Sequence, residues 1–168
     1  MTAGKLILEV VTPERSVVRE EVDFIELPGR DGCLGILPGH APLLTELGGG
    51  VLTFQKGQEK RFASAVGGFA EVLGDRVIVL AEQSELAEEI DVGRARAAQE
   101  RALKLLAEKT ERVDFNVAQL ALERSLIRLE AARLAGHADV TVKHRPRGMA
   151  AAKAGPQESS SASAPEKK

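Results

Sequence analysis

The chain has 168 residues, of which 43% are hydrophobic and 29% charged, and its formal net charge is −2. This composition is typical of a soluble protein with one domain and an appendage, or with two small domains. The low net charge and the 3% of aromatic residues argue against nucleic-acid binding, which relies on basic surfaces and stacking side chains. The single cysteine, Cys33, excludes an internal disulfide and fits a reducing compartment.

The first residues, MTAGKLILEVVTPERS, contain a short apolar run that a proline and several charges soon interrupt. Such a run is too short for a signal peptide or a membrane-spanning helix. We therefore expect the chain to reach a membrane only through a partner.

The first half of the chain consists of short apolar runs separated by glycine, proline and polar turns. Leu6, Leu8 and Val10 alternate with their neighbours, which is typical of a strand with one buried face. Gly74 and Asp75 predict a tight hairpin turn. Many short strands at this spacing predict an all-β sandwich or barrel. The predicted strands are residues 5–11, 22–27, 51–55, 61–66, 69–73 and 76–82.

From Asp91 onward the chain has no proline until Pro146 and is rich in residues that favour helices. We predict two helices over residues 91–109 and 114–136, which a short polar link joins into an antiparallel hairpin. Asp91 and Asp114 are suited to cap the helix starts, and Gly136 to end the second helix.

The predicted buried stripe of the first helix is mostly alanine, which buries little apolar area. We therefore expect a weakly held hairpin that is able to open or to change partners. The stripes consist of Ala95, Ala98, Ala102 and Leu105 or Leu106 on the first helix, and of Phe115, Ala118, Leu122, Leu126 and Leu129 on the second.

The last segment, residues 137–168, is rich in alanine, serine, proline and lysine. It is predicted to be a disordered tail, because it cannot bury enough apolar surface to offset its ordering entropy. The expected organisation is therefore a β-domain over residues 1–84, a helical hairpin over 85–136 and this tail.

The sequence contains no phosphate-binding loop motif and no dinucleotide-binding motif. Cys33 and the three histidines are too few and too scattered for a zinc site, and His40 has no recognisable nucleophile beside it. We predict neither a metal site nor a catalytic set. The stretch GCLGILPGHAPLL, residues 32–44, is apolar with a polar tip, and it suits docking on another surface.

Arg124 and Arg128 lie four residues apart on the second predicted helix, where like charges repel unless an anion lies between them. An antiparallel hairpin would bring them near the start of the first helix. Two interpretations remain open at this point: an anion site, or a solvated face whose arginines pair with the preceding glutamates. On charge alone the solvated face is the simpler interpretation, because ion pairs on protein surfaces are common and contribute little. The glutamates concerned are Glu85, Glu88 and Glu89.

The order of these features resembles that of the epsilon subunits of F-type ATP synthases (delta in mitochondria). The resemblance covers about residues 4–135 and is carried by VVTPER, GILPGHAPL, AVGGFAEV, VIVLAE, EEIDVGRARAAQERA and LALERSLIRLEAA. It implies a ten-stranded β-sandwich followed by two helices. It also implies a non-catalytic rotor subunit that couples ion flow to ATP synthesis, on the cytoplasmic face of the bacterial plasma (inner) membrane.

The resemblance further implies partners and a docking loop. The sandwich would dock on the gamma subunit and on the c-ring, and the helices would extend into the alpha and beta subunits to inhibit ATP hydrolysis. The implied c-ring docking loop consists of Ile36, Leu37, Pro38, Gly39, His40, Ala41 and Pro42.

Some members of this family bind ATP through a motif written I/L-D-x-x-R-A. The resemblance implies regulatory ATP here rather than a required cofactor, although Gly93 inside the motif weakens the first helical turn. The implied nucleotide-binding residues are Glu85, Ile90, Asp91, Arg94, Ala95, Arg124 and Arg128.

Two other functional classes compete with the rotor subunit. One is a free-standing ATP-sensing module that uses the same charged residues. The other is an enzyme built on a β-sandwich, and the lack of any nucleophile and base set argues against it.

Overall fold

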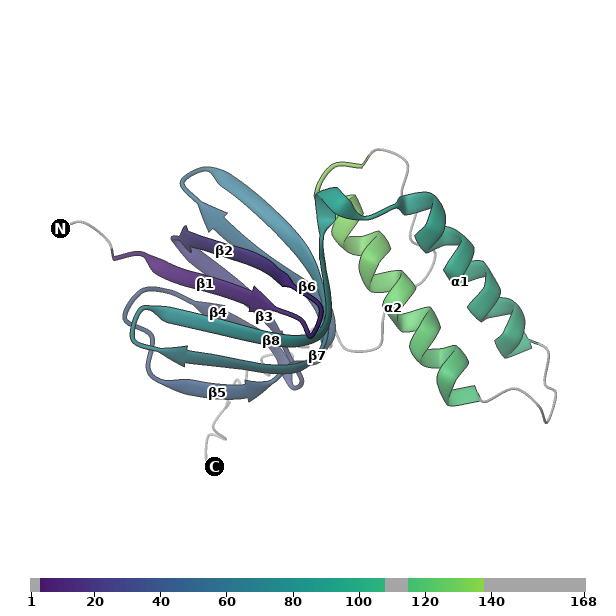
Figure 1. Ribbon diagram of the computed structural model, residues 1–168, viewed down its shortest axis with the longest axis horizontal. Coiled ribbons are helices and arrows are strands. Elements are labelled where there is room, and N and C mark those ends of the chain that lie inside the picture. Colours follow the sequence, from purple (N-terminus) through teal and green to yellow (C-terminus); the bar gives the residue numbers. More distant parts are fainter. Residues whose placement is uncertain (1–3, 108–114, 138–168) are drawn as a thin grey trace, which may run out of the picture.

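A computed structural model of the chain describes residues 4–107 and 115–137 (Figure 1). The predicted cap at Asp114 and, apart from His137, the predicted tail lie outside these residues. The described elements are the strands β1 (Leu6–Val11), β2 (Ser16–Val22), β3 (Phe24–Gly29), β4 (Gly32–Ile36), β5 (Leu43–Glu46), β6 (Gly49–Lys56), β7 (Glu59–Leu73) and β8 (Arg76–Leu86), the 3₁₀ turn η1 (Ala87–Glu89), and the helices α1 (Val92–Ala107) and α2 (Phe115–Leu134).

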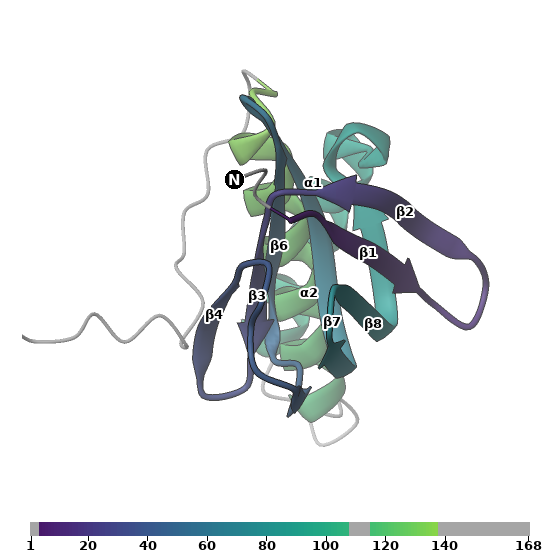
Figure 2. The same cartoon turned by 90° about the vertical axis from the view of Figure 1, so that its left-hand side faces the viewer.

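The strands form one hydrogen-bonded sheet in the order β2-β1-β8-β7-β6-β3-β4, with β5 also paired to β7. All of these pairs are antiparallel except the parallel pair of β1 and β8. The sheet folds over on itself, so that β1 and β2 lie on one side and β3 and β4 on the other (Figure 2). Alternate residues such as Leu6, Leu8 and Val10 fill the core between the two sides. The predicted β-sandwich is therefore confirmed.

The implied number of ten strands is wrong, because the described residues contain eight. Residues 61–66 and 69–73, predicted as two strands, belong to the single strand β7. Gly67 and Gly68 have φ values of +61° and +97°, and a Cβ atom on Gly68 would lie 1.9 Å from the carbonyl oxygen of Leu80. Only glycine fits there, so β7 bends at this point without losing its register with β8.

Strand β2 was not predicted because little of it faces the core. Its sequence SVVREEV buries only Val18 and Val22, while Arg19 and Glu20 carry charge along an edge of the sheet. Charged residues are usual on an edge strand, where they discourage pairing with another chain. The alternation that identifies a half-buried strand is correspondingly weak in this segment.

The predicted ends of the helices are confirmed where they are described. The backbone N–H of Arg94 donates to Oδ1 of Asp91 at 2.9 Å, which caps the start of α1. At the other end Gly136 has φ +85°, and the N–H of His137 donates to the carbonyl oxygen of Ala132 at 3.1 Å. This is the left-handed glycine ending that the sequence predicts for α2.

The alanine seam of the hairpin is confirmed only in part. Ala95, Ala102 and Ala118 are buried, but Phe115 is 61% exposed and Leu105 is 43% exposed. These two residues lie at the end of the hairpin that projects away from the sandwich, so no described element covers them (Figure 1). The predicted place of Phe115 in the buried stripe is therefore wrong, whereas of the two alternatives for the first helix Leu106 is half-buried and Leu105 is exposed.

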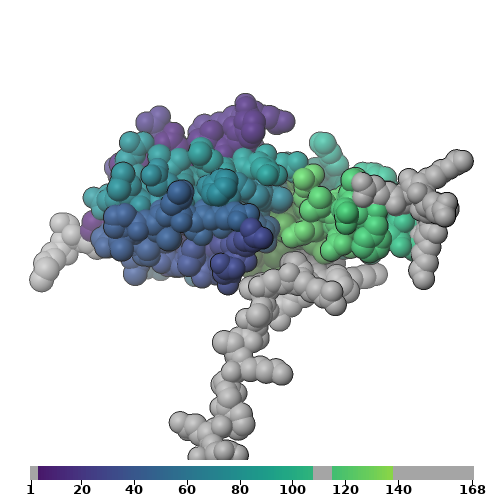
Figure 3. All heavy atoms as spheres, turned by 90° about the horizontal axis from the view of Figure 1, so that it is seen from below, coloured from purple at the N-terminus to yellow at the C-terminus, as the bar shows by residue number. Residues whose placement is uncertain are grey.

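Helix α2 packs against the outside of the sandwich, on β6 and β7 (Figures 1 and 3). A Cβ atom on Gly49 would lie 2.8 Å from Cδ1 of Ile127, so the helix approaches the strand closely. Leu129 and its small neighbours on α2 form a second apolar cluster, which contains Ala87, Ile90, Ala95, Leu129, Ala131 and Ala132 and packs on Val51, Phe62 and Val92.

Candidate functional site

The charged residues at the base of the hairpin come together in part. Nε of Arg128 on α2 donates to Oε2 of Glu85 on β8 at 2.6 Å. Glu85 stands opposite Ser64 of β7, on the side of the sheet that α2 covers. The simpler interpretation of the sequence, in which an arginine pairs with a preceding glutamate, therefore holds for Arg128.

Arg124 differs from Arg128, although it lies one turn away on the same helix. Its Nε atom is buried and has no hydrogen-bond partner among the described residues. A buried donor without an acceptor costs free energy, so such groups usually mark a strained or functional position. A negatively charged oxygen that reached this atom would satisfy it.

The four motif residues at the start of α1 have different roles. Asp91 accepts the N–H of Arg94 as the helix cap, and Ile90 and Ala95 are buried in the cluster with Leu129 of α2. Arg94 is exposed and has no ion pair within the described part of the chain. Three of the four residues therefore already build the hairpin, and Arg94 is the one whose side chain remains available to a ligand.

The implied docking loop is a rigid turn with an exposed apolar tip. Gly39 has φ +82°, and the N–H of His40 donates to the carbonyl oxygen of Leu37 at 3.1 Å. Nδ1 of His40 lies 2.7 Å from the carbonyl oxygen of Ala41, so this ring nitrogen carries a proton and donates. Leu37 is exposed, whereas Ile36 is fully buried and anchors the loop in the core. Of the remaining members, Pro38 is half-buried and Ala41 and Pro42 are exposed.

A second apolar surface, which the sequence analysis missed, covers the outside of β1, β5, β7 and β8. Phe69 stands opposite Leu80 in the register of β7 and β8, and both side chains are more than half exposed. Leu44, which is 71% exposed, lies two residues after the docking loop and continues this surface onto β5. We call this surface the outer apolar face; its exposed members are Ile7, Leu44, Phe69, Leu73 and Leu80.

The sequence signal for this surface is the presence of apolar residues on both faces of strand β8. In β8 the buried residues are Val77, Val79 and Ala81, yet the intervening Ile78 and Leu80 are apolar as well. A strand that is apolar on both faces is usually covered on both. Charged residues lie on the same face, because Glu71 stands opposite Ile78 and Arg76 opposite Leu73. Exposed apolar side chains gathered among polar ones are typical of a protein–protein interface.

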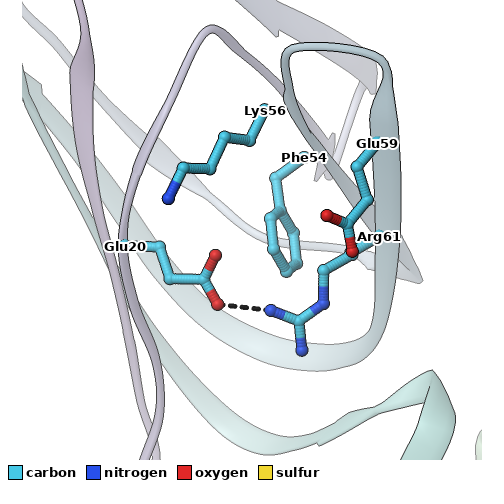
Figure 4. Close-up of a pocket in the computed structure, with 5 residues that line it drawn as sticks. All are labelled: Glu20, Phe54, Lys56, Glu59 and Arg61. Atoms are coloured by element: carbon cyan, nitrogen blue, oxygen red, sulfur yellow. Dashed lines mark hydrogen bonds and ion pairs between the residues drawn. The ribbon is translucent and has the colours of Figure 1, made fainter.

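Two small hollows lie on the described part of the sandwich. One has a volume of about 170 Å³ and is lined by charged side chains around Phe54 (Figure 4). No group of three or more His, Cys, Asp or Glu side chains within the described ranges could hold a metal ion. None of the described helices is long and apolar enough to span a membrane.

Comparisons with known proteins cover most of the chain. Residues 5–87 match the family model of the β-sandwich domain of the ATP synthase delta/epsilon chain, and residues 88–133 match that of its long α-helix domain. An ATP synthase epsilon chain from Syntrophobacter fumaroxidans is 48% identical over 130 residues, covering 77% of this chain and 97% of the relative. The epsilon chain from Solibacter usitatus is 50% identical over 125 residues, covering 74% of this chain and 93% of the relative.

A solved structure agrees with these relatives. One chain of the mitochondrial ATP synthase of Euglena gracilis, in a structure of OSCP, F1 and the c-ring, matches with a TM-score of 0.64 and 26% identity. The match covers 78% of this chain and 81% of that one.

Proposed function

Because the chain belongs to the ATP synthase delta/epsilon chain family, we propose that it is a rotor subunit that couples ion flow to ATP synthesis in an F-type ATP synthase. It is a non-catalytic subunit of that complex. The observation that carries the rotor role is the pair of neighbouring apolar surfaces, the docking loop and the outer apolar face. A subunit that transmits torque needs two such contacts, one to each rotor partner.

The docking loop is assigned to the c-ring and the outer apolar face to the gamma subunit. The loop supports the first assignment because its turn is held by its own hydrogen bonds, so it keeps its shape before binding. The face supports the second because it is wide and runs over several strands. Through these contacts the chain is held peripherally on the cytoplasmic face of the bacterial plasma membrane.

Two substitutions test the assignments separately. A charge at Leu37 should weaken retention of the c-ring, and a charge at Phe69 should weaken retention of gamma, because each buries a carboxylate in an apolar contact. Co-purification of both partners with tagged Leu37→Asp and Phe69→Asp chains measures this. Leu103→Asp on α1 is the matched control, because Leu103 is exposed outside both surfaces. Equal retention by all three chains would contradict the assignments.

We also propose that the helical hairpin inhibits ATP hydrolysis by leaving the sandwich and contacting the alpha and beta subunits. The several alanines of the apolar cluster between α2 and the sandwich support this role, because each buries little area and so leaves a modest free-energy difference between the docked and the released hairpin. The exposed apolar residues at the projecting end, among them Phe115 and Leu105, would then contact the catalytic subunits.

ATP, as a regulatory ligand and not a required cofactor, is proposed to stabilise the docked hairpin. Arg124 would hold a phosphate through its unpaired Nε, and Arg128 would share its guanidinium between that phosphate and Glu85. Arg94 would add a third positive charge.

Calorimetric titration of the isolated chain with ATP tests this site. Arg124→Gln should weaken binding at least about tenfold, which is the effect of losing one charge-assisted hydrogen bond. The matched control is Arg133→Gln on the same helix, because Arg133 is exposed and pairs with Glu130. Binding that is equally strong in all three chains, or undetectable in the unmodified chain, would refute the ATP site.

A further inference from the structure

Two arginines of the sandwich hold the segment that leads into the helices. This junction segment is η1, Ala87–Glu89. Arg15, in the turn between β1 and β2, bonds Glu89 with both terminal nitrogens, Nη1 donating to Oε1 at 3.3 Å and Nη2 donating to Oε2. Nε of Arg61 on β7 donates to Oε1 of Glu88 at 3.2 Å. Both carboxylates of the junction segment are therefore held by the sandwich.

Arg61 is itself fixed from two further directions. Its Nη1 bonds Glu20 of β2, and its guanidinium lies over the ring of Phe54, 5.4 Å from the centroid (Figure 4). Because Glu20 and the ring of Phe54 already restrict the side chain of Arg61, it loses little further conformational entropy when it binds Glu88. Lys56 and Glu59 also line this hollow, and Arg15 additionally experiences the charges of Glu14 and Glu85.

The hairpin is attached to the sandwich in a different way. Helix α2 contacts the sheet mainly through small and apolar side chains, including Ile127 against Gly49, and through the ion pair of Arg128 with Glu85. Because few hydrogen bonds or ion pairs cross this contact, we expect the two helices to leave the sheet together. The junction segment contacts both α2 and β7, and its Ala87 belongs to the apolar cluster of α2, so its two carboxylates are the groups that bind it to the sandwich alone.

The residues between the junction segment and helix α1 belong to no helix or strand. Ile90 is extended, with φ −71° and ψ 118°, and Asp91 precedes the helix. Gly93 in the first turn of α1 lowers the cost of changing the backbone there. Rotation about a few such residues is what a hinge requires.

We propose that the junction segment remains bound to the sandwich when the hairpin leaves it, so that the hairpin pivots about Ile90–Gly93 with Arg15 and Arg61 as positioning residues. The inference rests on the proposed function for the release of the hairpin. It goes further by locating the hinge after η1 rather than at the end of β8. The released helices would then start from a fixed point and direction on the sandwich.

The carboxyl group of Glu89 reports directly on this anchor. The hydrogen bonds from Arg15 lower the pKa of Glu89 from its ordinary value of 4.5. We would measure this pKa by carbon NMR titration of the isolated full chain and of an Ile127→Asp chain, in which a buried carboxylate releases α2. Amide hydrogen exchange in α2 verifies the release, and Ala131→Asp is a second releasing variant, since Ala131 is fully buried.

The anchor predicts that Glu89 keeps its lowered pKa in both released variants and that this pKa rises toward its ordinary value of 4.5 only in Arg15→Gln, because the hydrogen bond from Arg15 is the largest cause of the lowering. A return to that value in the released variants would overturn the proposal, because η1 would then have left with the hairpin. Asp23 serves as an internal control for the sandwich, because the N–H of Gly57 and the Lys5 side chain lower its pKa. The readout uses the isolated chain, so it stands whether or not the chain inhibits ATP hydrolysis.

Discussion

At the scale of single residues, the cap of α1 is the clearest local determinant of the hairpin. Asp91 accepts the backbone N–H of Arg94 at 2.9 Å. Asp91→Ala should lower the free energy of unfolding by about 1 kcal/mol, the usual cost of losing a helix cap. Urea unfolding of the two chains measures the difference, with Asp91→Asn as the control that keeps an accepting oxygen. A loss of equal size in the control would show that capping is not the cause.

The ion pair at the junction segment makes a second residue-scale prediction, which concerns pH. Glu89 has a pKa below 4.5 in the folded chain, because Arg15 donates to its carboxylate. The stabilisation is therefore present above the unfolded pKa and is lost as the pH falls through the folded pKa. The difference in urea midpoint between the unmodified chain and Glu89→Gln should be largest near neutral pH and should vanish in acid. A difference that does not change with pH would contradict this account.

At the scale of elements, the bend of β7 depends on Gly68. A Cβ atom there would lie 1.9 Å from the carbonyl oxygen of Leu80, at φ +97°. Gly68→Ala should therefore destabilise the sandwich by roughly 3 kcal/mol or more, because backbone strain and a backbone clash add together. Gly57→Ala is the control, since Gly57 has φ +61° but no atom within 4 Å of its Cβ position. Thermal unfolding compares the two, and a loss no larger at Gly68 than at Gly57 would contradict the role of the close approach.

Elements whose determinants are local could be predicted from the sequence. The alternation of β1, the turn at Gly74, the cap at Asp91 and the ending at Gly136 each depend on a few neighbouring residues. The continuity of β7 could not, because its bend depends on the approach of Leu80 from another strand.

The same limit applies to the candidate site. The pairing of Arg128 with a preceding glutamate was among the predicted alternatives, but the orphaned Nε of Arg124 depends on how α2 packs on the sheet. The bond between Arg15 and Glu89 joins residues 74 positions apart, and no motif marks either one. The burial of Ile36 could not be predicted either, because it depends on how the end of β4 packs into the sandwich core and not on the apolar sequence of the loop.

At the scale of the whole molecule, the sandwich and the hairpin contribute different kinds of surface. The sandwich presents the docking loop and the outer apolar face on a framework with its own closed core. The hairpin covers β6 and β7 through a small apolar cluster, in which Leu129 and the alanines of α2 pack on Val51 and Phe62, and through one ion pair. A rigid docking part that carries a weakly held regulatory part is the arrangement that the proposed function requires.

The central claim is that release of the hairpin inhibits ATP hydrolysis, and a reversible tether tests it. Gly49→Cys with Ile127→Cys, in a Cys33→Ser background, places one thiol on each side of the close contact between β6 and α2, where Cδ1 of Ile127 lies 2.8 Å from the Cβ position of Gly49, and oxidation is used to join the two thiols as a disulfide. The decisive measurement is ATP hydrolysis by a catalytic complex depleted of this chain, with the tethered chain added back in its oxidised and reduced forms. We expect both forms to bind and only the reduced form to suppress hydrolysis. Equal suppression by the two forms, or none by either although both bind, would contradict the account.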